Sequence, residues 1–544
     1  MLSYRKLAMR VLGRPLHTEG IDSPRPASQR AAALVLTAAM LTTLAAPAFA
    51  DIWRIEDGDI TVKAGETEGT NKVSQGTNKD VVDTNTIITN QNKDTTSSHT
   101  VTIETNDKND KVEVTLKDVN IDTSSRNKAA VSVTGEGDTN IKLDGDNALK
   151  SDIYRSGIYG SGSGSLTISG GENDSLTAQG GSGANGISSS GSLTISGGTV
   201  TANGDDGGRG ISSSGSVTIS GGSTVTANGG SGTISGGDGI WSGGGVTISG
   251  GSTVTANGGN GGSLVGGDGI RSGGGLTVSD GTVTAKGGNG DSKDGYGGDG
   301  IRSGGVVTIS GNTVNAAGGY GGKVGGYGIC SFDRVAISGG TVEAAGGNGS
   351  TGGGSGIYSS VIDLSGSLEL TAKAGSPTGK ALLQNGRELD LDTIKDKLGP
   401  GAKVTATDAN GDSKQVSIPR PVEPEEPVIP EESSSSSDGG SATPSAPVSP
   451  LPGLTVTDKD GQRISYTSTQ SGNALTVCVG RLTASLRISL AALRQMRAEG
   501  IETITFQTVL CSTTLSVDEL LAMGGEDAEA VLTHRFTDSS LTVG

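Results

Sequence analysis

The sequence predicts a mainly β protein built on a right-handed parallel β-helix. The first observation is a pattern repeated between residues 165 and 375, whose copies follow one another at spacings of 24 to 31 residues. A fixed period of this length indicates a solenoid in which each repeat forms one coil. The second observation is a Gly-Ile step in every copy, with its isoleucine at Ile158, Ile187, Ile211, Ile240, Ile270, Ile301, Ile329 and Ile357.

The third observation is the alternation of apolar and polar residues within each copy. Leu193 and Ile195 flank Thr194, which predicts a strand whose aliphatic side chains face inward. Three strands per coil, each paired with its equivalent about 4.8 Å away in the next coil, give a continuous core, and such crossovers are right-handed. A disordered low-complexity tract is the alternative, but the glycines stand at fixed offsets between the strands. The Gly-rich loop before each Gly-Ile step varies in length, so insertions are expected to be tolerated there.

The N-terminal segment predicts export. Residues 1–50 carry basic residues, then the apolar run 31–44 and the small-residue site Ala48-Phe49-Ala50, an order typical of a secretory signal peptide cleaved near Ala50. Its removal takes the net charge from −17 to −21, because the segment holds six Lys/Arg and two Asp/Glu. So acidic a chain disfavours nucleic acid as a partner. No later stretch is long and apolar enough for a membrane span, so a secreted or bacterial cell-surface location is expected.

Composition divides the remaining chain into four parts. Residues 51–150 are predicted to form an N-terminal cap and the first irregular coils, with a polar loop at 66–92. Residues 151–418 form the regular β-helix and its closing segment, including a short helix at 393–398. The Pro/Ser/Glu-rich residues 419–453 form an extended linker. Residues 454–544 form a small α+β domain with helices at 490–499 and 516–523.

The chain has three cysteines, Cys330, Cys478 and Cys511. The last two lie in predicted strands of the C-terminal domain. In an exported protein they could pair as a disulfide, and two reduced buried thiols are the alternative.

A resemblance to a known family rests on the order of motifs ahead of the regular repeats. The segments 112–121, 129–133 and 141–149, followed by Gly157-Ile158 and the Leu-Thr-Ile-Ser-Gly-Gly coils, resemble a family of secreted bacterial carbohydrate-binding β-helix proteins with Gly-rich repeats. The resemblance covers about residues 59–375. It implies a right-handed parallel β-helix that binds plant-type polysaccharides and holds calcium through acidic groups on its coils. None of the family's calcium or sugar ligands can be matched to a single position here.

The position after each Gly-Ile step predicts an exposed column along the coils. It holds Tyr159, Ser188, Ser212, Trp241, Arg271, Arg302, Cys330 and Tyr358. Aromatic faces can stack on sugar rings, and arginines on neighbouring coils can bind a carboxylate such as that of a uronic acid. The candidate carbohydrate-binding residues are therefore Tyr159, Trp241, Arg271, Arg302 and Tyr358. A solvated face with scattered aromatic residues is the alternative.

Two further columns are polar. Asp238, Asp268 and Asp299 stand two residues before the isoleucine in consecutive repeats. Aligned carboxylates are candidate calcium ligands, while Asp-Gly is also an ordinary turn dipeptide. The column Asn203, Asn228 and Asn257 predicts a ladder of hydrogen-bonded amides.

These features favour an exported, non-catalytic polysaccharide-binding or adhesin-like surface protein, with a polysaccharide or cell-wall glycan as partner and calcium as the one cofactor suggested. Catalysis is less favoured, because after residue 50 the only histidines are His99 and His534, in different predicted domains. The first alternative is a β-helical enzyme: a glycosidase that uses paired carboxylates, or a polysaccharide lyase that uses calcium and a basic residue such as Arg271 or Arg302. A structural surface spacer is the second.

Overall fold

A computed structural model confirms the predicted fold class. The larger unit is a parallel β-solenoid of about 14 turns with about 28 residues per turn. The structure describes residues 52–419 and 453–543, with gaps at 459–461, 465, 472, 480–482, 509–511, 524–527 and 536–537. The chain divides after residue 424 into two compact units. The predicted signal peptide and most of the predicted linker lie outside the described residues.

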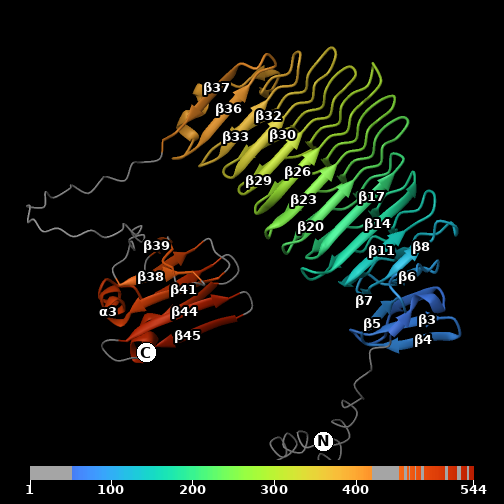
Figure 1. The fold of residues 1–544 in the computed structure, drawn as a ribbon, viewed down its shortest axis with the longest axis horizontal. Coiled ribbons are helices and arrows are strands. Elements are labelled where there is room, and N and C mark those ends of the chain that lie inside the picture. Colours follow the sequence, from blue (N-terminus) through green and yellow to red (C-terminus); the bar gives the residue numbers. More distant parts are fainter. Residues whose placement is uncertain are drawn as a thin grey trace, which may run out of the picture. The chain divides into compact units, whose positions relative to one another are not determined.

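Each regular coil contributes three strands, and each strand pairs in parallel with its equivalent in the next coil (Figure 1). The first strands are β2 (Ile60–Ala64), β6 (Val101–Glu104), β9 (Val131–Thr134), β12 (Ile158–Gly160), β15 (Ile187–Ser189), β18 (Ile211–Ser213), β21 (Ile240–Ser242), β24 (Ile270–Ser272), β27 (Ile301–Ser303) and β34 (Leu382–Gln384), with the first parts of β30 (Ile329–Ile337) and β32 (Ile357–Leu364). The second strands are β1 (Ile52–Arg54), β5 (Thr86–Thr89), β7 (Lys111–Lys117), β10 (Asp138–Asp144), β13 (Leu166–Ser169), β16 (Leu193–Ser196), β19 (Val217–Ser220), β22 (Val246–Ile248), β25 (Leu276–Val278), β28 (Val307–Ile309) and the second parts of β30 and β32.

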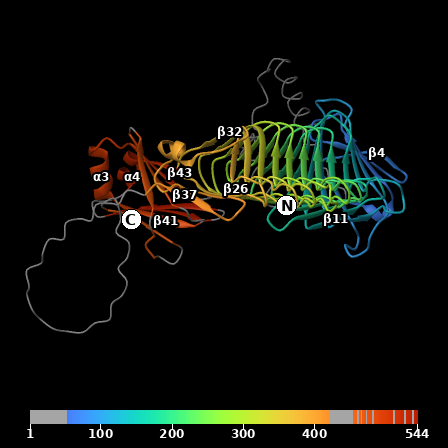
Figure 2. The ribbon, with the colours of Figure 1, turned by 90° about the horizontal axis from the view of Figure 1, so that it is seen from above.

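The third strands form a separate sheet. They are β8 (Asn120–Asp122), β11 (Asp146–Lys150), β14 (Ser175–Ser182), β17 (Thr199–Asp205), β20 (Thr224–Asn228), β23 (Ser252–Asn257), β26 (Gly281–Lys286), β29 (Thr313–Ala317), β31 (Thr341–Ala345), β33 (Glu369–Lys373) and β36 (Lys403–Thr407). From above, the coils follow one another in chain order (Figure 2).

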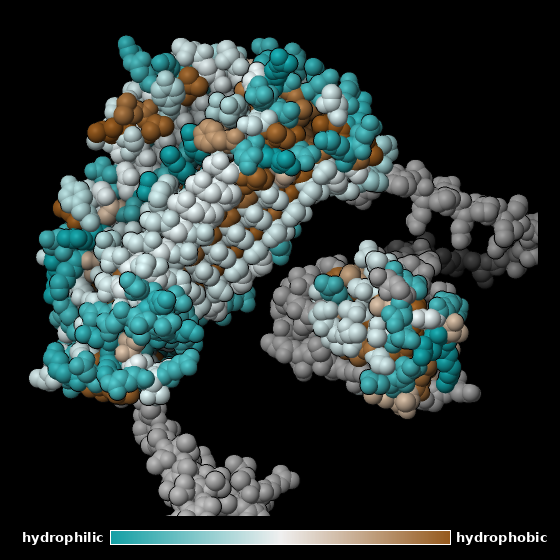
Figure 3. Space-filling view, turned by 180° about the vertical axis from the view of Figure 1, so that it is seen from behind, coloured by the Kyte–Doolittle hydropathy of each residue, from teal (hydrophilic) through white to brown (hydrophobic). Residues whose placement is uncertain are grey.

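In-register pairing places equivalent aliphatic residues over one another in the core. Ile187 pairs with Ile211 and Ile211 with Ile240, and all three side chains are fully buried. In β16, Leu193 and Ile195 are buried while the intervening threonine is partly exposed, as the alternation predicts. The middle coils accordingly show a largely pale surface of intermediate hydropathy (Figure 3).

The predicted amide ladder is also present. The side-chain amide of Asn228 donates to Asn203 Oδ1, and that of Asn257 donates to Asn228 Oδ1, each at 2.8 Å. These bonds run from coil to coil, parallel to the backbone pairing of β17, β20 and β23.

The Gly-rich loops are packed layers, not loosely held insertions. Gly259 N–H donates to Gly237 O, Gly267 N–H to Gly259 O, and Gly288 N–H to Gly267 O, each at 2.8 Å. A Cβ placed on Gly267 would overlap the carbonyl of Gly237. Glycine is required here because backbones of neighbouring coils approach without room for a side chain. The expected tolerance to insertion therefore does not extend to these paired glycines.

The prediction of a polar loop at 66–92 is wrong. This segment contains β3 (Asn71–Gln75), β4 (Asn78–Asp83) and β5, and β3 lies antiparallel between β2 and β4 at the N-terminal end of the solenoid. The inward positions of β3 hold Asn71, Val73 and Gln75, so its buried face carries two amides. Those amides are satisfied internally, since Asn71 donates to Glu113 O and Gln75 to Arg54 O. Because two of its three inward residues are polar, this strand lacks the alternation of apolar and polar residues from which the other strands were predicted.

Short helices and hairpins complete the solenoid. The 3-10 helix η1 (Ile55–Asp57) lies near its start. At its far end, β35 (Arg387–Glu388) precedes the 3-10 helix η2 (Leu391–Lys397), close to the predicted helix, and β37 (Ser413–Ser417) pairs antiparallel with β36.

The second unit is an α+β fold with two four-stranded sheets. One sheet contains β38 (Leu454–Thr457), β41 (Ala484–Ser489), β44 (Glu529–Arg535) and β45 (Asp538–Val543); the other contains β39 (Thr467–Ser471), β40 (Ala474–Cys478), β42 (Thr503–Gln507) and β43 (Ser512–Ser516). Helices α3 (Leu490–Ala498) and α4 (Val517–Met523) match the predicted ones, and Ser489 Oγ caps α3. Among the described residues, no helix has the length and apolar character needed to cross a membrane.

Candidate functional site

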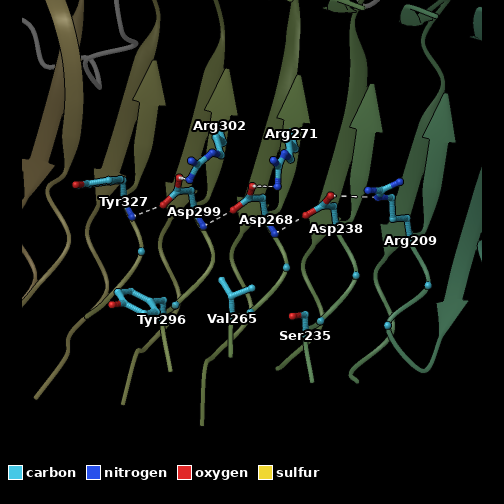
Figure 4. Close-up of a pocket in the computed structure, with 18 of the residues that line it drawn as sticks. Arg209, Ser235, Asp238, Val265, Asp268, Arg271, Tyr296, Asp299, Arg302 and Tyr327 are labelled. Carbon is cyan, nitrogen blue, oxygen red and sulfur yellow. Dashed lines mark hydrogen bonds and ion pairs between the residues drawn. The ribbon is translucent and has the colours of Figure 1, made fainter. Parts of the chain in front are cut away.

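A cleft of about 680 Å³ crosses the middle coils of the solenoid. Two rows of side chains line it, and Figure 4 shows both rows running from coil to coil. The charged row contains Arg209, Asp238, Asp268, Arg271, Asp299, Arg302 and Tyr327, and the loop row contains Ser235, Val265, Tyr296 and Val324. Pairs of glycines separate the rows in each coil, so the cleft floor is backbone without side chains.

The loop row is held in register by the Gly-rich loops. Ser235 pairs with Val265, Val265 with Tyr296, and Tyr296 with Val324, all in parallel. Tyr296 is 45% exposed, and Lys323 Nζ lies 5.5 Å from its ring centroid. One side of the cleft is therefore apolar and aromatic.

The charged row contains a ladder of buried carboxyl groups. Asp238 Oδ1 accepts a hydrogen bond from the backbone N–H of Asp268 at 2.9 Å, and Asp268 Oδ1 accepts one from that of Asp299 at 2.7 Å. Asp299 Oδ1 in turn accepts the backbone N–H of Tyr327 at 2.7 Å. The exposed fractions of the three aspartates are 6%, 6% and 3%. Each carboxyl thus joins its own coil to the next.

An arginine lies on the outer side of each carboxyl. Arg302 Nη1 is 3.1 Å from Asp299 Oδ2, and Arg271 Nη1 is 3.8 Å from Asp268 Oδ2. Both pairs are formed within a coil, between the residue before the Gly-Ile step and the residue after it. Arg209 Nε instead reaches Asp238 Oδ2 on the next coil at 3.2 Å. Arg271 makes the longest of the three ion pairs, and half of its side chain is exposed.

Burial changes the acidity of the ladder. Burial raises the pKa of Asp299 to about 6, although the Tyr327 N–H and the Arg302 guanidinium act in the opposite direction. Burial also raises the pKa of Asp268 well above its usual range, and the neighbouring Asp299 and Asp238 carboxylates add to the rise. These two groups therefore hold protons far more readily than an exposed aspartate.

The structure places the predicted carbohydrate-binding residues in one register but in different surroundings. Arg271 and Arg302 line the cleft. Trp241 is half-buried beside it, with the Arg209 guanidinium 4.3 Å from its ring centroid. Tyr358 is half-buried and stacks on Tyr327, with ring centroids 5.1 Å apart.

Tyr159 and Cys330 depart from the rest of the column. Tyr159 is 43% exposed and lies outside the residues that line the cleft. The expectation that Ser212 and Cys330 would be exposed is wrong, because only 7% and 1% of these residues are accessible. The register partners of Cys330 are Arg302 and Tyr358, which carry much longer side chains on both sides. Burial raises the pKa of the Cys330 thiol to about 12.

Sequence reasoning missed Arg209, Tyr327 and the whole loop row of the site. Arg209 and Tyr327 occupy the position of the aspartates, two residues before the isoleucine, in the coils on either side. Extending the aspartate column by one repeat each way would have found them. Tyr296 also stands at a fixed offset, five residues before Ile301, as Val265 stands five before Ile270, and following this column would have found the loop row.

The aspartates have internal partners where calcium ligation was predicted. Each Oδ1 accepts a backbone N–H, and each Oδ2 faces an arginine. Across the described ranges, no three His, Cys, Asp or Glu side chains are grouped to hold a metal ion. We do not assign Asp238, Asp268 and Asp299 as metal ligands. Calcium binding by the chain stays a prediction.

The proposed disulfide also stays a prediction. Cys478 ends β40, and its Sγ lies 3.5 Å from Gln507 Oε1. Cys511 lies outside the described residues.

Comparisons with known proteins do not identify a ligand for the cleft. Searches of protein-family models, curated proteins and solved structures find no match to this chain. The family resemblance and the predicted export therefore remain expectations from the sequence, and a function has to be argued from the cleft itself.

Proposed function

We propose that the chain is an exported, non-catalytic polysaccharide-binding or adhesin-like surface protein that binds an extended glycan along the cleft. The observation that carries this proposal is the repetition of the cleft wall. Arg271 and Arg302 stand at equivalent positions on neighbouring coils, opposite Val265 and Tyr296, which are equivalent to each other. A polymer with a repeating unit can make the same contact on successive coils.

The chemistry of the two rows supports a sugar ligand. The exposed Tyr296 ring offers a face for stacking on a pyranose ring. Arg271 and Arg302 supply hydrogen-bond donors suited to hydroxyl and carboxylate oxygens. The glycine floor lets a ligand approach the backbone closely. Trp241 contributes indirectly, by supporting the guanidinium of Arg209.

A binding experiment tests the proposal. The purified chain is screened on arrays of pectins, β-glucans and bacterial wall glycans with and without calcium, and hits are measured by calorimetry. Tyr296→Ala is expected to weaken binding about tenfold, equivalent to about 1.4 kcal/mol. Arg271→Gln is expected to weaken it by a similar factor, and Trp241→Ala by less.

Two residues outside the cleft serve as matched controls. Tyr320 is 47% exposed, a fraction similar to the 45% of Tyr296, but it does not line the cleft. Tyr320→Ala should therefore bind the glycan as wild type does. Arg334 pairs with Asp363 elsewhere and is as exposed as Arg271, so Arg334→Gln should also bind normally. Equal losses in Tyr296→Ala and Tyr320→Ala would argue against the cleft. Absence of glycan binding would favour a structural spacer.

A catalytic alternative rests on one observation. Asp268, with its raised pKa, lies one coil from the carboxyl of Asp238, and glycoside hydrolysis pairs a protonated carboxylic acid with a second carboxylate. Release of reducing ends or of unsaturated uronates from a bound glycan, lost in Asp268→Asn, would establish a glycosidase or lyase.

A further inference from the structure

We propose that Arg271 and Arg302 form a binding site for anionic groups, and that the carboxyls of Asp268 and Asp299 switch this site on by taking up protons. The inference rests on the proposed function, because it concerns the same cleft, and it adds a ligand chemistry and its control. The anionic group is a sulfate, phosphate or carboxylate, either free or carried by a glycan.

The carboxyls cannot separate to relieve their repulsion. Parallel strands of neighbouring coils lie about 4.8 Å apart, and the Oδ1 hydrogen bonds fix Asp238, Asp268 and Asp299 at equivalent positions on three successive coils. All three side chains are more than nine-tenths buried. Like charges so close in a poorly solvated site favour proton uptake by one or more members.

The groups facing the ladder determine what proton uptake does. The charged and titratable groups around it are Arg209, Arg271, Arg302, Tyr296, Tyr327, Cys330 and Lys323. Burial raises the pKa values of the Tyr327 hydroxyl and the Cys330 thiol, so both groups stay neutral below pH 8. With every carboxyl ionised, the three arginines of the cleft face three carboxylates. Each proton taken up leaves one arginine without its counter-ion.

Arg271 and Arg302 are the arginines released in this way. They stand in register on neighbouring strands β24 and β27, and both line the cleft. The side chains remain 50% and 36% exposed in their ion pairs, so an anion in the cleft can reach them. Arg209 is as exposed as Arg302, but its guanidinium lies closer to an aromatic ring, 4.3 Å from the Trp241 centroid against 5.2 Å between Arg302 and Phe332. The raised pKa of Asp299, about 6, places the change between pH 7.5 and pH 5.

The experiment measures anion binding at two pH values. Dextran sulfate, neutral dextran and inorganic sulfate are titrated into the full chain at pH 7.5 and pH 5.0 at constant ionic strength. Wild type is expected to bind dextran sulfate at least about tenfold more tightly at pH 5.0, while neutral dextran shows no such change. Inorganic sulfate binding with the same pH dependence would indicate a site for the free anion, and dextran sulfate binding alone would indicate one for a substituted polymer.

Variants separate the switch from a general effect of pH on an acidic protein. Asp299→Asn should bind dextran sulfate tightly at both pH values, and Arg271→Gln with Arg302→Gln should lose the gain at pH 5.0. Asp363→Asn removes a partly exposed carboxylate, paired with Arg334 and Lys397 outside the cleft, and should keep the wild-type pH dependence. An unchanged pH dependence in Asp299→Asn, or no gain at pH 5.0 in wild type, overturns the proposal.

A measurement on wild type covers the case in which Asp299→Asn fails to fold. Carboxyl carbon NMR of the labelled chain should show one aspartate signal that titrates above pH 5 and is absent from the Asp268→Asn spectrum. If every aspartate titrated below pH 5, the proposed control of anion binding by proton uptake would be wrong. Glycan binding that does not depend on pH would then leave the proposed function standing without it.

Discussion

Arg302 and Asp299 lie three residues apart on either side of a Gly-Ile step, and their side chains meet at 3.1 Å. Only 5% of the Asp299 side chain is exposed, against 36% for Arg302. Asp299 Oδ1 also accepts the Tyr327 N–H, so the carboxyl joins a cation within its coil to the backbone of the next coil. The Asp299 carboxylate therefore both balances the charge of Arg302 in the cleft and helps to hold neighbouring coils together.

The two members of this pair should respond unequally to substitution. Arg302→Gln leaves a buried carboxylate without its cation and is expected to lower the free energy of unfolding by about 2 kcal/mol at pH 7.5. Asp299→Asn keeps a side-chain oxygen for the Tyr327 N–H and leaves a partly hydrated arginine, so a loss below about 1 kcal/mol is expected. Urea denaturation of both variants measures the difference.

The exposed pair Arg334–Asp363, at 3.9 Å, provides the control. Arg334→Gln should change stability by less than about 0.5 kcal/mol, as for most surface ion pairs. A larger loss in Asp299→Asn than in Arg302→Gln would contradict the assignment of Asp299 as the buried member.

The stability of the solenoid unit should rise as the pH is lowered from 7.5 to 5, whereas in the second unit burial lowers the pKa of His534 and has the opposite effect. A pKa of about 6 for Asp299 in the folded chain, against an ordinary value of 3.8, means that the folded state binds the extra proton in this window. Folding is then favoured at the lower pH, by at most about 3 kcal/mol for this one group between pH 7 and pH 4. Asp59 and Asp122 have lowered pKa values, so their contribution is lost only below about pH 4. Thermal unfolding at pH 7.5, 6.5, 5.5 and 5.0 checks the slope.

Asp299→Asn should flatten this pH dependence, because the group that takes up the proton is gone. Asp363→Asn, which removes an exposed carboxylate, should leave it in place. A solenoid unit that loses stability steadily from pH 7.5 to pH 5 would contradict the raised pKa of Asp299.

The fold followed from the sequence because the core repeats. Ile240 and Ile270 occupy equivalent inward positions, and a side chain of one type at a fixed offset specifies both the strand and its partner. The strand β3 was not predicted because its inward positions include Asn71 and Gln75. The burial of these amides depends on backbone carbonyl acceptors that segments distant in the sequence provide. The hydrophobic pattern carries no sign of those acceptors.

The site could be predicted only in pieces. The aspartate and arginine columns are visible as separate periodicities, but a spacing of three residues does not by itself bring the side chains of Asp268 and Arg271 together. The opposite wall depends on the stacking of loops of unequal length, which brings Val265 beside Tyr296. This column also has a fixed offset, five residues before each isoleucine, but the sequence does not show that it faces the arginines across a floor of glycine backbone.

Calcium should have little effect on the melting temperature if Arg209, Arg271 and Arg302 stay paired with the three aspartates. A calcium ion at Asp268 would have to displace the Arg271 guanidinium or the Asp299 N–H from the carboxyl. The melting temperature is therefore expected to change by less than about 1 °C between excess chelator and millimolar calcium. An ion that does not bind the folded state cannot stabilise it. Magnesium serves as the control cation. A rise of several degrees specific to calcium would instead support the calcium prediction made from the sequence.

The packed glycine layers should be the least tolerant part of the repeat. Gly267→Ala places a methyl group against the carbonyl of Gly237 in the neighbouring coil, and both belong to backbone segments that hydrogen-bond to Gly259. Relief requires the coils to separate, so a loss of about 3 kcal/mol or more is expected. Gly352→Ala is the matched control, because its Cβ would meet only side-chain atoms, the nearest being those of Val324 at 3.5 Å. The control should stay within about 0.5 kcal/mol of wild type, since an alanine that fits also restricts the unfolded chain. If urea denaturation gave equal midpoints for the two variants, the glycines would be acting as flexible spacers, and the close backbone packing of these layers would be wrong.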